Sequence, residues 1–365
     1  MTLSRRRLML IGATALFGGG AIAREDTPGF SDDIDERLDL GYRSGLLAGL
    51  HAVLAVRGGD IVLARYFAGP DENWGRPLGD VVFDAETLHD LRSVTKSITS
   101  LLYGIALDRG IVPPPEAPLL DAFPRYADLK ADPERAAWTV SHALNMTLGT
   151  EWNETLPYTD PNNSEIAMEL AADRYRFILD RPIVDVPGRV WNYNGGCSAL
   201  IGYLIEQGAG TSLADFAAQH LFGPLDISDF EWNAGRDGVL SAASGLRLTA
   251  PGLATIGRMM LNGGRWNSDR IVTEAWLQRC RTPQIAAFFG NQYSHQWYLS
   301  DQPVPAANGT RPMIAAMGNG GQRLFVLPSL DLVIVTFSGN YNRPDQWINP
   351  TLVLQKIVLA NLRDI

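Results

Sequence analysis

Ser93 and Lys96 are the residues whose types and spacing most directly suggest chemistry. They enclose the tetrapeptide Ser93-Val94-Thr95-Lys96, and Lys96 is one of only three lysines in the chain. Residues three apart on a helix lie on one face, about one turn apart, so the hydroxyl and the amine can meet. A serine hydroxyl becomes a nucleophile when a neighbouring base removes its proton. The pair therefore predicts a serine nucleophile activated by lysine.

The run from Ser93 to Arg109 predicts a buried helix with this pair in its first turn. Apolar side chains recur at helical spacing, and Gly110 and a run of prolines end the pattern. Burial and the positive end of a helix dipole both lower the pKa of a lysine, so Lys96 is expected to be a neutral base. The alternative is that Ser93 only caps the helix while Lys96 reaches solvent, but this apolar helix has little solvated face.

A second segment with suitable chemistry contains Tyr193. Tyr193 and Asn194 precede two glycines and a predicted helix over 200–206, which puts the phenol on a loop at a helix start. A serine hydrolase needs a group that passes a proton to the leaving atom, and a tyrosine can do so. A core aromatic in a turn is the alternative.

A third segment is the glycine-rich run Gly318-Asn319-Gly320-Gly321-Gln322, which leads into a predicted strand over 323–327. Glycines beside a strand leave backbone N–H groups accessible. Gly320, Gly321 and Gln322 are therefore predicted to hold an oxyanion or an extended substrate. A flexible turn is the alternative.

Strands are predicted near both ends of the chain. The β-rich runs 51–56 and 61–67 form one hairpin, and 323–327 and 332–337 form another. Asn349-Pro350 is expected to open a final helix, with Asn349 as its cap.

These elements predict an α+β fold in which both hairpins join one antiparallel sheet flanked by terminal helices. A helical lobe is inserted in the middle. We expect a single domain over 24–365, with the sheet lobe covering about 31–85 and 285–365 and the helical lobe about 86–284. The Ser93 helix would then begin at the seam between the lobes, where clefts usually lie.

The N-terminus predicts export. Ser4-Arg5-Arg6-Arg7-Leu8-Met9 resembles a twin-arginine signal, and an uncharged run follows that ends in Ala21-Ile22-Ala23. Residues 1–23 are therefore expected to be a signal peptide that directs the protein through the export machinery to the periplasm. A general secretory signal and a retained anchor are the alternatives, although the run is short for a membrane span.

Composition excludes several classes of partner. The formal net charge of −9 gives no basic footprint for nucleic acid. The histidines and cysteines are too few and too scattered to predict a metal site, so no metal and no cofactor is expected. Cys197 and Cys280 could form one bridge in the periplasm, but two buried thiols are favoured. Asp160 and Glu165 are expected to be solvated loop charges.

In this order, Ser93-x-x-Lys96, Tyr193 and the glycine-rich run resemble the three motifs of penicillin-recognising, β-lactamase-like serine hydrolases. The segments 139–149, 245–249 and 262–266 also resemble that family, so the likeness spans roughly residues 40 to 360. It implies a β-lactamase/transpeptidase-like α+β fold and catalysis without a cofactor.

The resemblance implies a role for each residue. Ser93 would form the acyl-enzyme, Lys96 would be its base, and Tyr193 would pass the proton to the leaving group. Backbone N–H groups of Ser93 and of Gly320–Gln322 would hold the oxyanion. Trp152 and Tyr158 lie on the loop after Gly149, which borders the cleft in relatives, and they could line an acyl pocket. Core packing is the alternative for Trp152.

Two departures from the family pattern indicate which branch of the family, and so which substrate class, to expect. The second motif usually reads Tyr-x-Asn, whereas Gly195 stands third here and Asn194 second; Asn194 is the candidate substrate ligand. The third motif lacks the Lys or His of β-lactamases. Both departures favour the esterase and 6-aminohexanoate-oligomer hydrolase branch, with a small ester or amide substrate. A β-lactamase or D,D-peptidase is the alternative enzyme, and a catalytically silent ligand-binding module is the alternative of another class.

Overall fold

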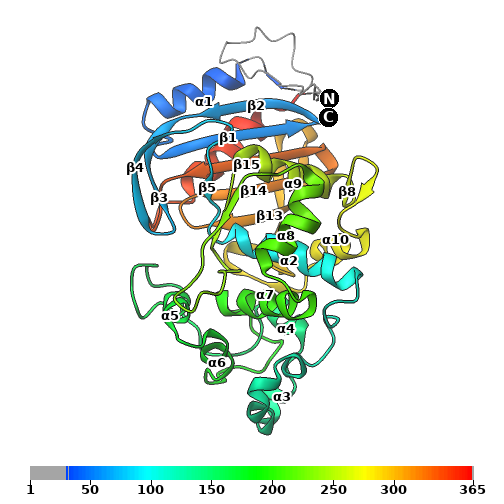
Figure 1. Cartoon of the computed structure of the whole chain (residues 1–365). Coiled ribbons are helices and arrows are strands. Elements are labelled where there is room, and N and C mark those ends of the chain that lie inside the picture. Colours follow the sequence, from blue (N-terminus) through cyan, green and yellow to red (C-terminus); the bar gives the residue numbers. More distant parts are fainter. Residues whose placement is uncertain (1–29, 32, 364–365) are drawn as a thin grey trace, which may run out of the picture.

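A computed structural model of the chain describes residues 30–31 and 33–363, so the predicted signal peptide lies outside the described part. Its main element is an eight-stranded antiparallel sheet in the order β10-β11-β12-β13-β14-β15-β1-β2, which fills the upper half of Figure 1. Its strands are β1 (Leu50–Arg57), β2 (Asp60–Tyr66), β10 (Ile285–Ala286), β11 (Gln292–Ser294), β12 (Trp297–Val304), β13 (Gly309–Gly318), β14 (Gln322–Leu327) and β15 (Leu332–Ser338).

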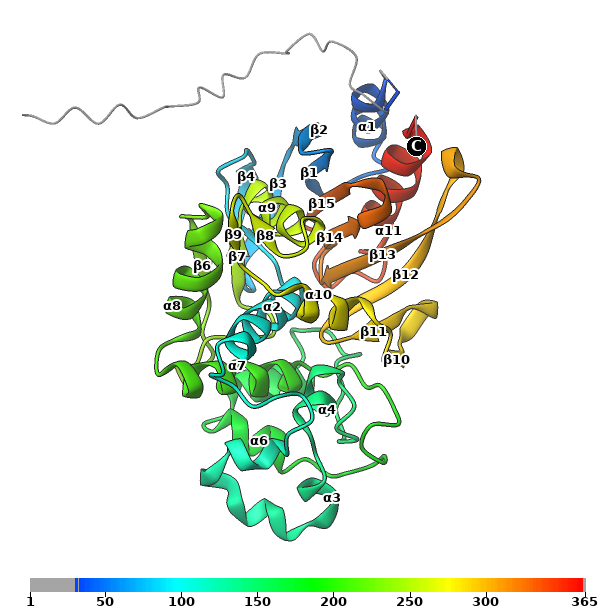
Figure 2. The same cartoon turned by 90° about the vertical axis from the view of Figure 1, so that its right-hand side faces the viewer.

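The sheet confirms the prediction that the two hairpins join. β1 pairs with β15 in a register that puts Val53 opposite Thr336, so strands from the two ends of the chain lie side by side. Helices α1 (Ile34–Arg43) and α11 (Ile348–Leu352) flank the sheet on one side, and α9 (Ala250–Leu261) packs on the other (Figure 2).

The start of the final helix differs from the expectation. α11 begins at Ile348, and Asn349 lies inside it rather than capping it. The Asn349 amide is buried and donates a 2.9 Å hydrogen bond to the carbonyl of Ala48. The helix therefore starts one residue before Asn349, with Trp347 at the N-cap position, and the asparagine amide anchors the helix to the segment before β1.

The remaining helices lie mostly below the sheet in Figure 1. They are α2 (Val94–Asp108), α3 (Pro133–Ala136), α4 (Val140–Leu144), α5 (Ser164–Leu170), α6 (Arg174–Leu179), α7 (Gly195–Ala209), α8 (Leu213–Ala217) and α10 (Glu274–Arg281). The short sheets are β3 (Ala68–Asn73) with β4 (Arg76–Val82), β5 (His89–Asp90) with β7 (Leu246–Leu248) and β6 (Phe230–Trp232), and β8 (Arg265–Trp266) with β9 (Asp269–Arg270). Within the described residues, no helix is long and apolar enough to cross a membrane.

α9 lies inside the range predicted for the helical lobe, yet it packs on the sheet. Its Gly257 makes this possible, because a Cβ there would lie 2.6 Å from Val333 of β15 and 3.0 Å from Leu324 of β14. A helix from the middle of the chain therefore packs on the sheet, and its local apolar periodicity does not predict this contact.

α2 matches the predicted helix to within one residue at each end, and nearly all of it is buried. Its polar side chains bond to backbone instead of water: Ser97 donates to the carbonyl of Gln296 at 2.7 Å and Thr99 to that of Ala242 at 2.9 Å. Because these polar groups have hydrogen-bond partners, the helix can pass through the core, and the buried helix holds the Ser93 segment in place.

Close packing of α2 against α10 gives a stability prediction. A Cβ on Gly104 would lie 2.2 Å from the buried ring of Trp276, so Gly104→Ala should lower the free energy of unfolding by about 2 kcal/mol despite the better helix propensity of alanine. Urea denaturation would measure it. Gly41→Ala in α1 is the control, since its Cβ would meet only the movable end of Leu47. Equal effects at both sites would contradict the proposed packing.

Candidate active site

Ser93 stands at the N-cap position of α2, and its hydroxyl does not cap the helix. Lys96 Nζ lies 3.2 Å from Ser93 Oγ and donates to it. The preceding residue, Arg92, holds a left-handed backbone with φ of 49°, a strained conformation of the kind found at functional turns. The alternative of a simple capping serine with a solvated lysine therefore does not hold.

Lys96 is buried and its ammonium meets three acceptors. They are Ser93 Oγ at 3.2 Å, Glu165 Oε2 at 3.1 Å and the carbonyl oxygen of Ala243 at 3.1 Å. Burial opposes the charged form, but Glu165, Tyr193 and Glu154 outweigh it and raise the pKa of Lys96 above its usual value. The expectation of a neutral Lys96 is therefore wrong for the resting site.

The carboxylate responsible, Glu165, was expected to be a solvated loop charge and is instead buried. It lies in the first turn of α5, where Asn163 caps the helix by accepting from the N–H of Glu165 at 3.0 Å. Burial would raise the pKa of Glu165, but Lys96 and neighbouring hydrogen bonds lower it overall. Glu165 is thus a carboxylate paired with Lys96.

A second carboxyl group, Glu154, extends this pair and was not identified from the sequence. It accepts hydrogen bonds from Trp152 Nε1 at 2.6 Å and Tyr158 OH at 2.9 Å, and also from the N–H of Gly195. Burial and the neighbouring Glu165 raise the pKa of Glu154 to about 8. The neighbouring negative charge therefore favours the protonated form of Glu154, while Lys96 favours the charged form of Glu165.

Tyr193 lies, as expected, on a loop immediately before a helix, here α7. The Lys96 ammonium is 4.9 Å from the centre of its ring. Burial raises the pKa of Tyr193 to about 12, while Lys96 and a side-chain hydrogen bond with Ser93 act in the opposite direction. The structure therefore brings Ser93, Lys96 and Tyr193 together.

Asn194 has a different place from the one expected. Its side-chain oxygen accepts from the N–H of Cys197 at 3.1 Å and caps α7. This contact supports the position of Tyr193 rather than a substrate. Cys197 and Cys280 are both buried free thiols.

The glycine-rich run lies beside the nucleophile, but some of its backbone N–H groups already have hydrogen-bond partners. A Cβ on Gly318 would lie 2.3 Å from the carbonyl oxygen of Leu91, so the run packs against the Ser93 segment. The N–H of Gly320 donates to Gln346 Oε1, and the N–H of Gly321 points to the Gly318 carbonyl at 3.4 Å. Gly320 is therefore not free to bind an oxyanion.

The side chain of Gln322 also has a structural use. It is fully buried, and it donates to the Ser338 carbonyl at 2.6 Å and accepts from the Ser338 N–H at 3.1 Å. By contrast, the N–H of Ser93 makes no hydrogen bond to another backbone group within the described residues. The Ser93 N–H is therefore available to an oxyanion.

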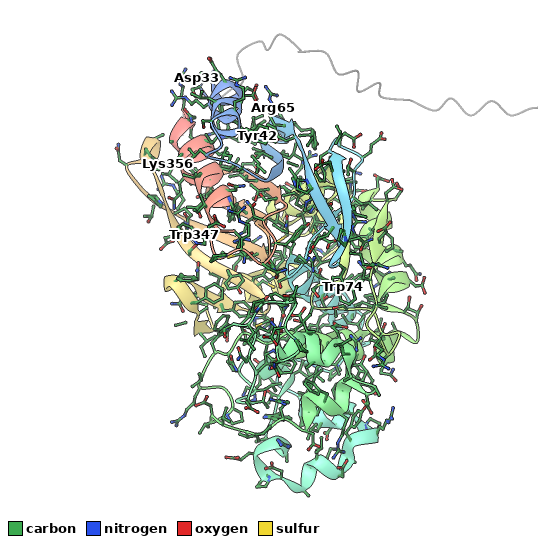
Figure 3. All side chains as sticks on the ribbon, turned by 90° about the vertical axis from the view of Figure 1, so that its left-hand side faces the viewer. Asp33, Tyr42, Arg65, Trp74, Trp347 and Lys356 are labelled. Atoms are coloured by element: carbon green, nitrogen blue, oxygen red, sulfur yellow. The ribbon has the colours of Figure 1, made fainter. Side chains whose placement is uncertain are left out.

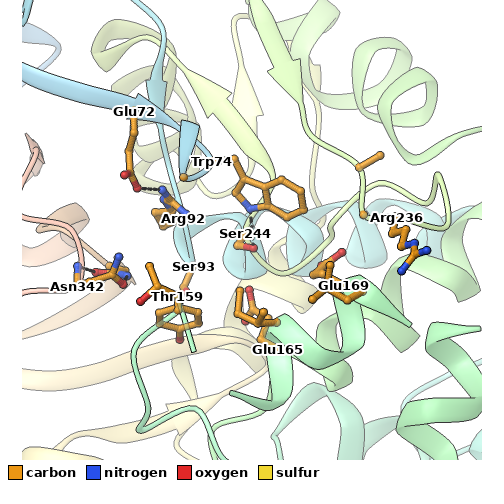
Figure 4. A pocket seen from close by; sticks show the side chains of 17 residues that line it. Glu72, Trp74, Arg92, Ser93, Thr159, Glu165, Glu169, Arg236, Ser244 and Asn342 are labelled. Atoms are coloured by element: carbon orange, nitrogen blue, oxygen red, sulfur yellow. Dashed lines mark hydrogen bonds and ion pairs between the residues drawn. The ribbon is translucent and has the colours of Figure 1, made fainter. Parts of the chain in front are cut away.

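A pocket of about 270 Å³ opens at Ser93 (Figure 4). Tyr158 and Glu165 line it from the helical side and Asn319 from the glycine-rich run. Trp152 is not among the lining residues; it is buried and packs edge-on against Phe177. The acyl pocket expected at Trp152 is thus not found there.

Two further lining residues, Trp74 and Arg92, had no sequence signal. Trp74, near the middle of the molecule in Figure 3, donates from its backbone N–H to Asp90 at 2.6 Å and from Nε1 to Ser244 at 3.2 Å. Arg92 pairs with Asp90 at 3.1 Å and with Glu72. They come from the β3–β4 hairpin and the turn before α2, which the fold alone brings to the cleft.

The raised pKa of Glu154 predicts a pH dependence of stability. The pKa of Glu154 is raised from 4.5 to about 8 in the folded protein, so the native state binds more protons than the unfolded state between these values. Its contribution is present below about pH 4.5 and is lost as pH rises to about 8, at up to about 1.4 kcal/mol per pH unit. Urea unfolding of Glu154→Gln from pH 5 to 8 should show a flatter profile. Exposed Glu36→Gln should follow the wild type, and an unchanged slope in Glu154→Gln would contradict the assignment.

The fold and this site together define a serine hydrolase of the β-lactamase type. The Beta-lactamase family model matches residues 44–354, and the chain belongs to this family. It is 26% identical over 309 residues to the 6-aminohexanoate-dimer hydrolase of Paenarthrobacter ureafaciens, covering 79% of this chain and 72% of that protein.

Solved structures agree on the fold. A putative 6-aminohexanoate-dimer hydrolase from Bacillus anthracis matches with a TM-score of 0.69 and 18% identity, over 87% of this chain and 81% of that one. EstCE1, a hydrolase with promiscuous acyltransferase activity, matches with a TM-score of 0.71 and 14% identity, over 90% and 99% of the two chains. The β-lactamase/transpeptidase-like α+β fold expected from the sequence is confirmed.

Proposed function

We propose that the protein hydrolyses a short linear ester or amide through an acyl-enzyme on Ser93. The observation that carries the proposal is the 3.2 Å contact between Ser93 Oγ and Lys96 Nζ, beside a pocket that Ser93 lines. Tyr193, whose ring centre lies 4.9 Å from the Lys96 ammonium, supplies the third group that acyl transfer needs.

The charge state of Lys96 changes the roles within this mechanism. As an ammonium paired with Glu165, Lys96 is not the first base; it stabilises a Tyr193 phenolate and orients Ser93. Tyr193 takes the Ser93 proton as Oγ bonds to the substrate carbonyl carbon, and the Ser93 N–H donates to the oxyanion. Tyr193 then returns that proton to the leaving alcohol or amine, and water releases the acyl group.

A linear substrate is favoured over a β-lactam. The third motif contributes Asn319 to the pocket where β-lactamases have a cation. Arg323, the nearest cation in that strand, directs Nη1 at the carbonyls of Gly318 and Gln322, both at 2.8 Å. Similarity to a 6-aminohexanoate-dimer hydrolase points the same way.

Turnover of a substrate panel tests the proposal. Wild type should cleave short-chain p-nitrophenyl esters or the linear 6-aminohexanoate dimer at least about 100-fold more efficiently than nitrocefin, and Ser93→Ala should cleave none of them. Ser97→Ala, in the same helix but bonded to Gln296, is the matched control. A preference for nitrocefin would establish the β-lactamase alternative. Folded wild type that binds a ligand but turns over none would establish the binding module.

We also propose that the protein is exported to the periplasm by the twin-arginine route, because residues 4–9 and 21–23 carry that pattern. Cell fractionation of full-length wild type and of Arg5→Lys/Arg6→Lys tests this. Export of the wild type and cytoplasmic retention of the variant are expected. Equal export of both would indicate another route.

A further inference from the structure

Three buried side chains from separate strands converge behind the active site. His51 is on β1, Asp71 on β3 and His89 on β5, and all three are almost completely inaccessible to solvent. His51 Nδ1 lies 2.9 Å from His89 Nε2, and Asp71 Oδ1 lies 3.6 Å from His89 Nε2 and 4.0 Å from His51 Nδ1. These atoms form a triangle of potential ligands.

Hydrogen bonding fixes where the protons are. His89 Nδ1 faces the carbonyl oxygen of Asp90 at 3.0 Å, so Nδ1 carries the hydrogen. His51 Nδ1 and His89 Nε2 are 2.9 Å apart, a hydrogen-bond distance, so one of these two nitrogens donates and the other accepts. His89 Nε2 is then a bare lone pair that accepts the N–H of His51 Nδ1.

This arrangement leaves Asp71 without a cation. Its Oδ1 faces the lone pair of His89 Nε2, and its Oδ2 has no hydrogen-bond partner within the described residues. The nearby guanidinium groups are engaged, since Arg92 and Arg247 both pair with Asp90, at 3.1 and 2.9 Å. A buried carboxylate that faces a lone pair is costly unless a positive charge lies between them.

We propose that His51 Nδ1, His89 Nε2 and Asp71 Oδ1 bind one zinc ion. A circle through three atoms at these separations has a radius of about 2.1 Å, and zinc binds imidazole nitrogen and carboxylate oxygen at about 2.0–2.2 Å. Two histidines and one carboxylate are a common zinc donor set. This site is separate from the Ser93 chemistry, and the sequence analysis did not predict it.

The surroundings match those of metal ligands. A metal-bound histidine usually donates its other ring N–H to a carbonyl or carboxylate, as His89 does to Asp90. Asp71 Oδ1, the proposed ligand atom, accepts from Tyr341 OH at 2.9 Å through its second lone pair, and this contact orients the carboxylate. On binding, the Nδ1 proton of His51 moves to Nε2, which has no partner in the described residues, and the ion sits between two neutral rings and one carboxylate.

Refolding the full chain with and without zinc tests the site. Because the cluster is buried, zinc must enter before the fold closes. Wild type refolded with zinc and then desalted should retain about one zinc ion per chain by inductively coupled plasma mass spectrometry. Its thermal midpoint should rise by about 5 °C or more over protein refolded with EDTA. Cobalt in place of zinc should give visible d–d absorption that Asp71→Asn lacks.

Variants separate this site from adventitious binding. Asp71→Asn and His51→Gln should lose the bound zinc, whereas His220→Gln, outside the cluster, should retain it. If a cluster variant does not fold, the cobalt spectrum of wild type decides the question. Loss of zinc in His220→Gln would overturn the proposal. So would folded wild type that holds no zinc and shows no cobalt spectrum after refolding with these ions, which would leave only a hydrogen-bonded cluster.

Discussion

Replacing Lys96 with alanine is expected to lower kcat/KM for the best ester or amide substrate by about 1000-fold. The ammonium orients Ser93 Oγ at 3.2 Å and stabilises a Tyr193 phenolate, and both effects are lost with it. The substitution also leaves the Glu165 carboxylate buried without its partner, so the free energy of unfolding should fall by about 3 kcal/mol. Steady-state kinetics and urea denaturation would measure the two effects.

A double variant separates these two consequences. Lys96→Ala/Glu165→Gln should regain most of the lost stability, because glutamine removes the unpaired charge, yet its activity should stay about 1000-fold low. If the double variant recovered activity together with stability, Lys96 would be a structural residue. That outcome would contradict its place in the mechanism.

Replacing Tyr193 with phenylalanine is expected to lower kcat/KM by about 1000-fold as well, with little change in stability. The pKa of Tyr193 is raised to about 12, so only a small fraction is phenolate at neutral pH. Wild-type kcat/KM should therefore rise with pH over the range in which the protein stays folded. In Tyr193→Phe this rise should disappear.

Tyr158→Phe is the matched control for this prediction. Tyr158 lines the pocket, and its hydroxyl donates to Glu154 at 2.9 Å rather than approaching Ser93. Its loss should change kcat/KM less than about 10-fold and leave the pH profile rising. Equal losses in the two variants would remove Tyr193 from its role as proton carrier.

What the sequence predicted correctly depends on local pattern. α2 follows from apolar periodicity and the Gly110 stop, and the two hairpins follow from β-rich runs around short turns. The order Ser93, Lys96, Tyr193 and a glycine-rich run into β14 identified the family and three groups that the structure brings together. None of these inferences needed a contact between distant residues.

The errors arose where such contacts decide the outcome. The charge state of Lys96 depends on Glu165, which reaches it only because Asn163 fixes the start of α5. The amide of Asn194 and the N–H of Gly320 look free in the sequence but bond to Cys197 and Gln346. A motif shows which groups are present, whereas their availability depends on the tertiary partners.

The most direct test of the central claim is the site at which an acylating or phosphonylating probe attaches. Folded wild type treated with a fluorophosphonate should gain the mass of one adduct, and peptide mapping should place it on Ser93. Ser93→Ala should gain none under the same conditions, while Ser97→Ala should label like the wild type. No adduct on folded wild type, or an adduct that persists in Ser93→Ala, would contradict Ser93 as the nucleophile.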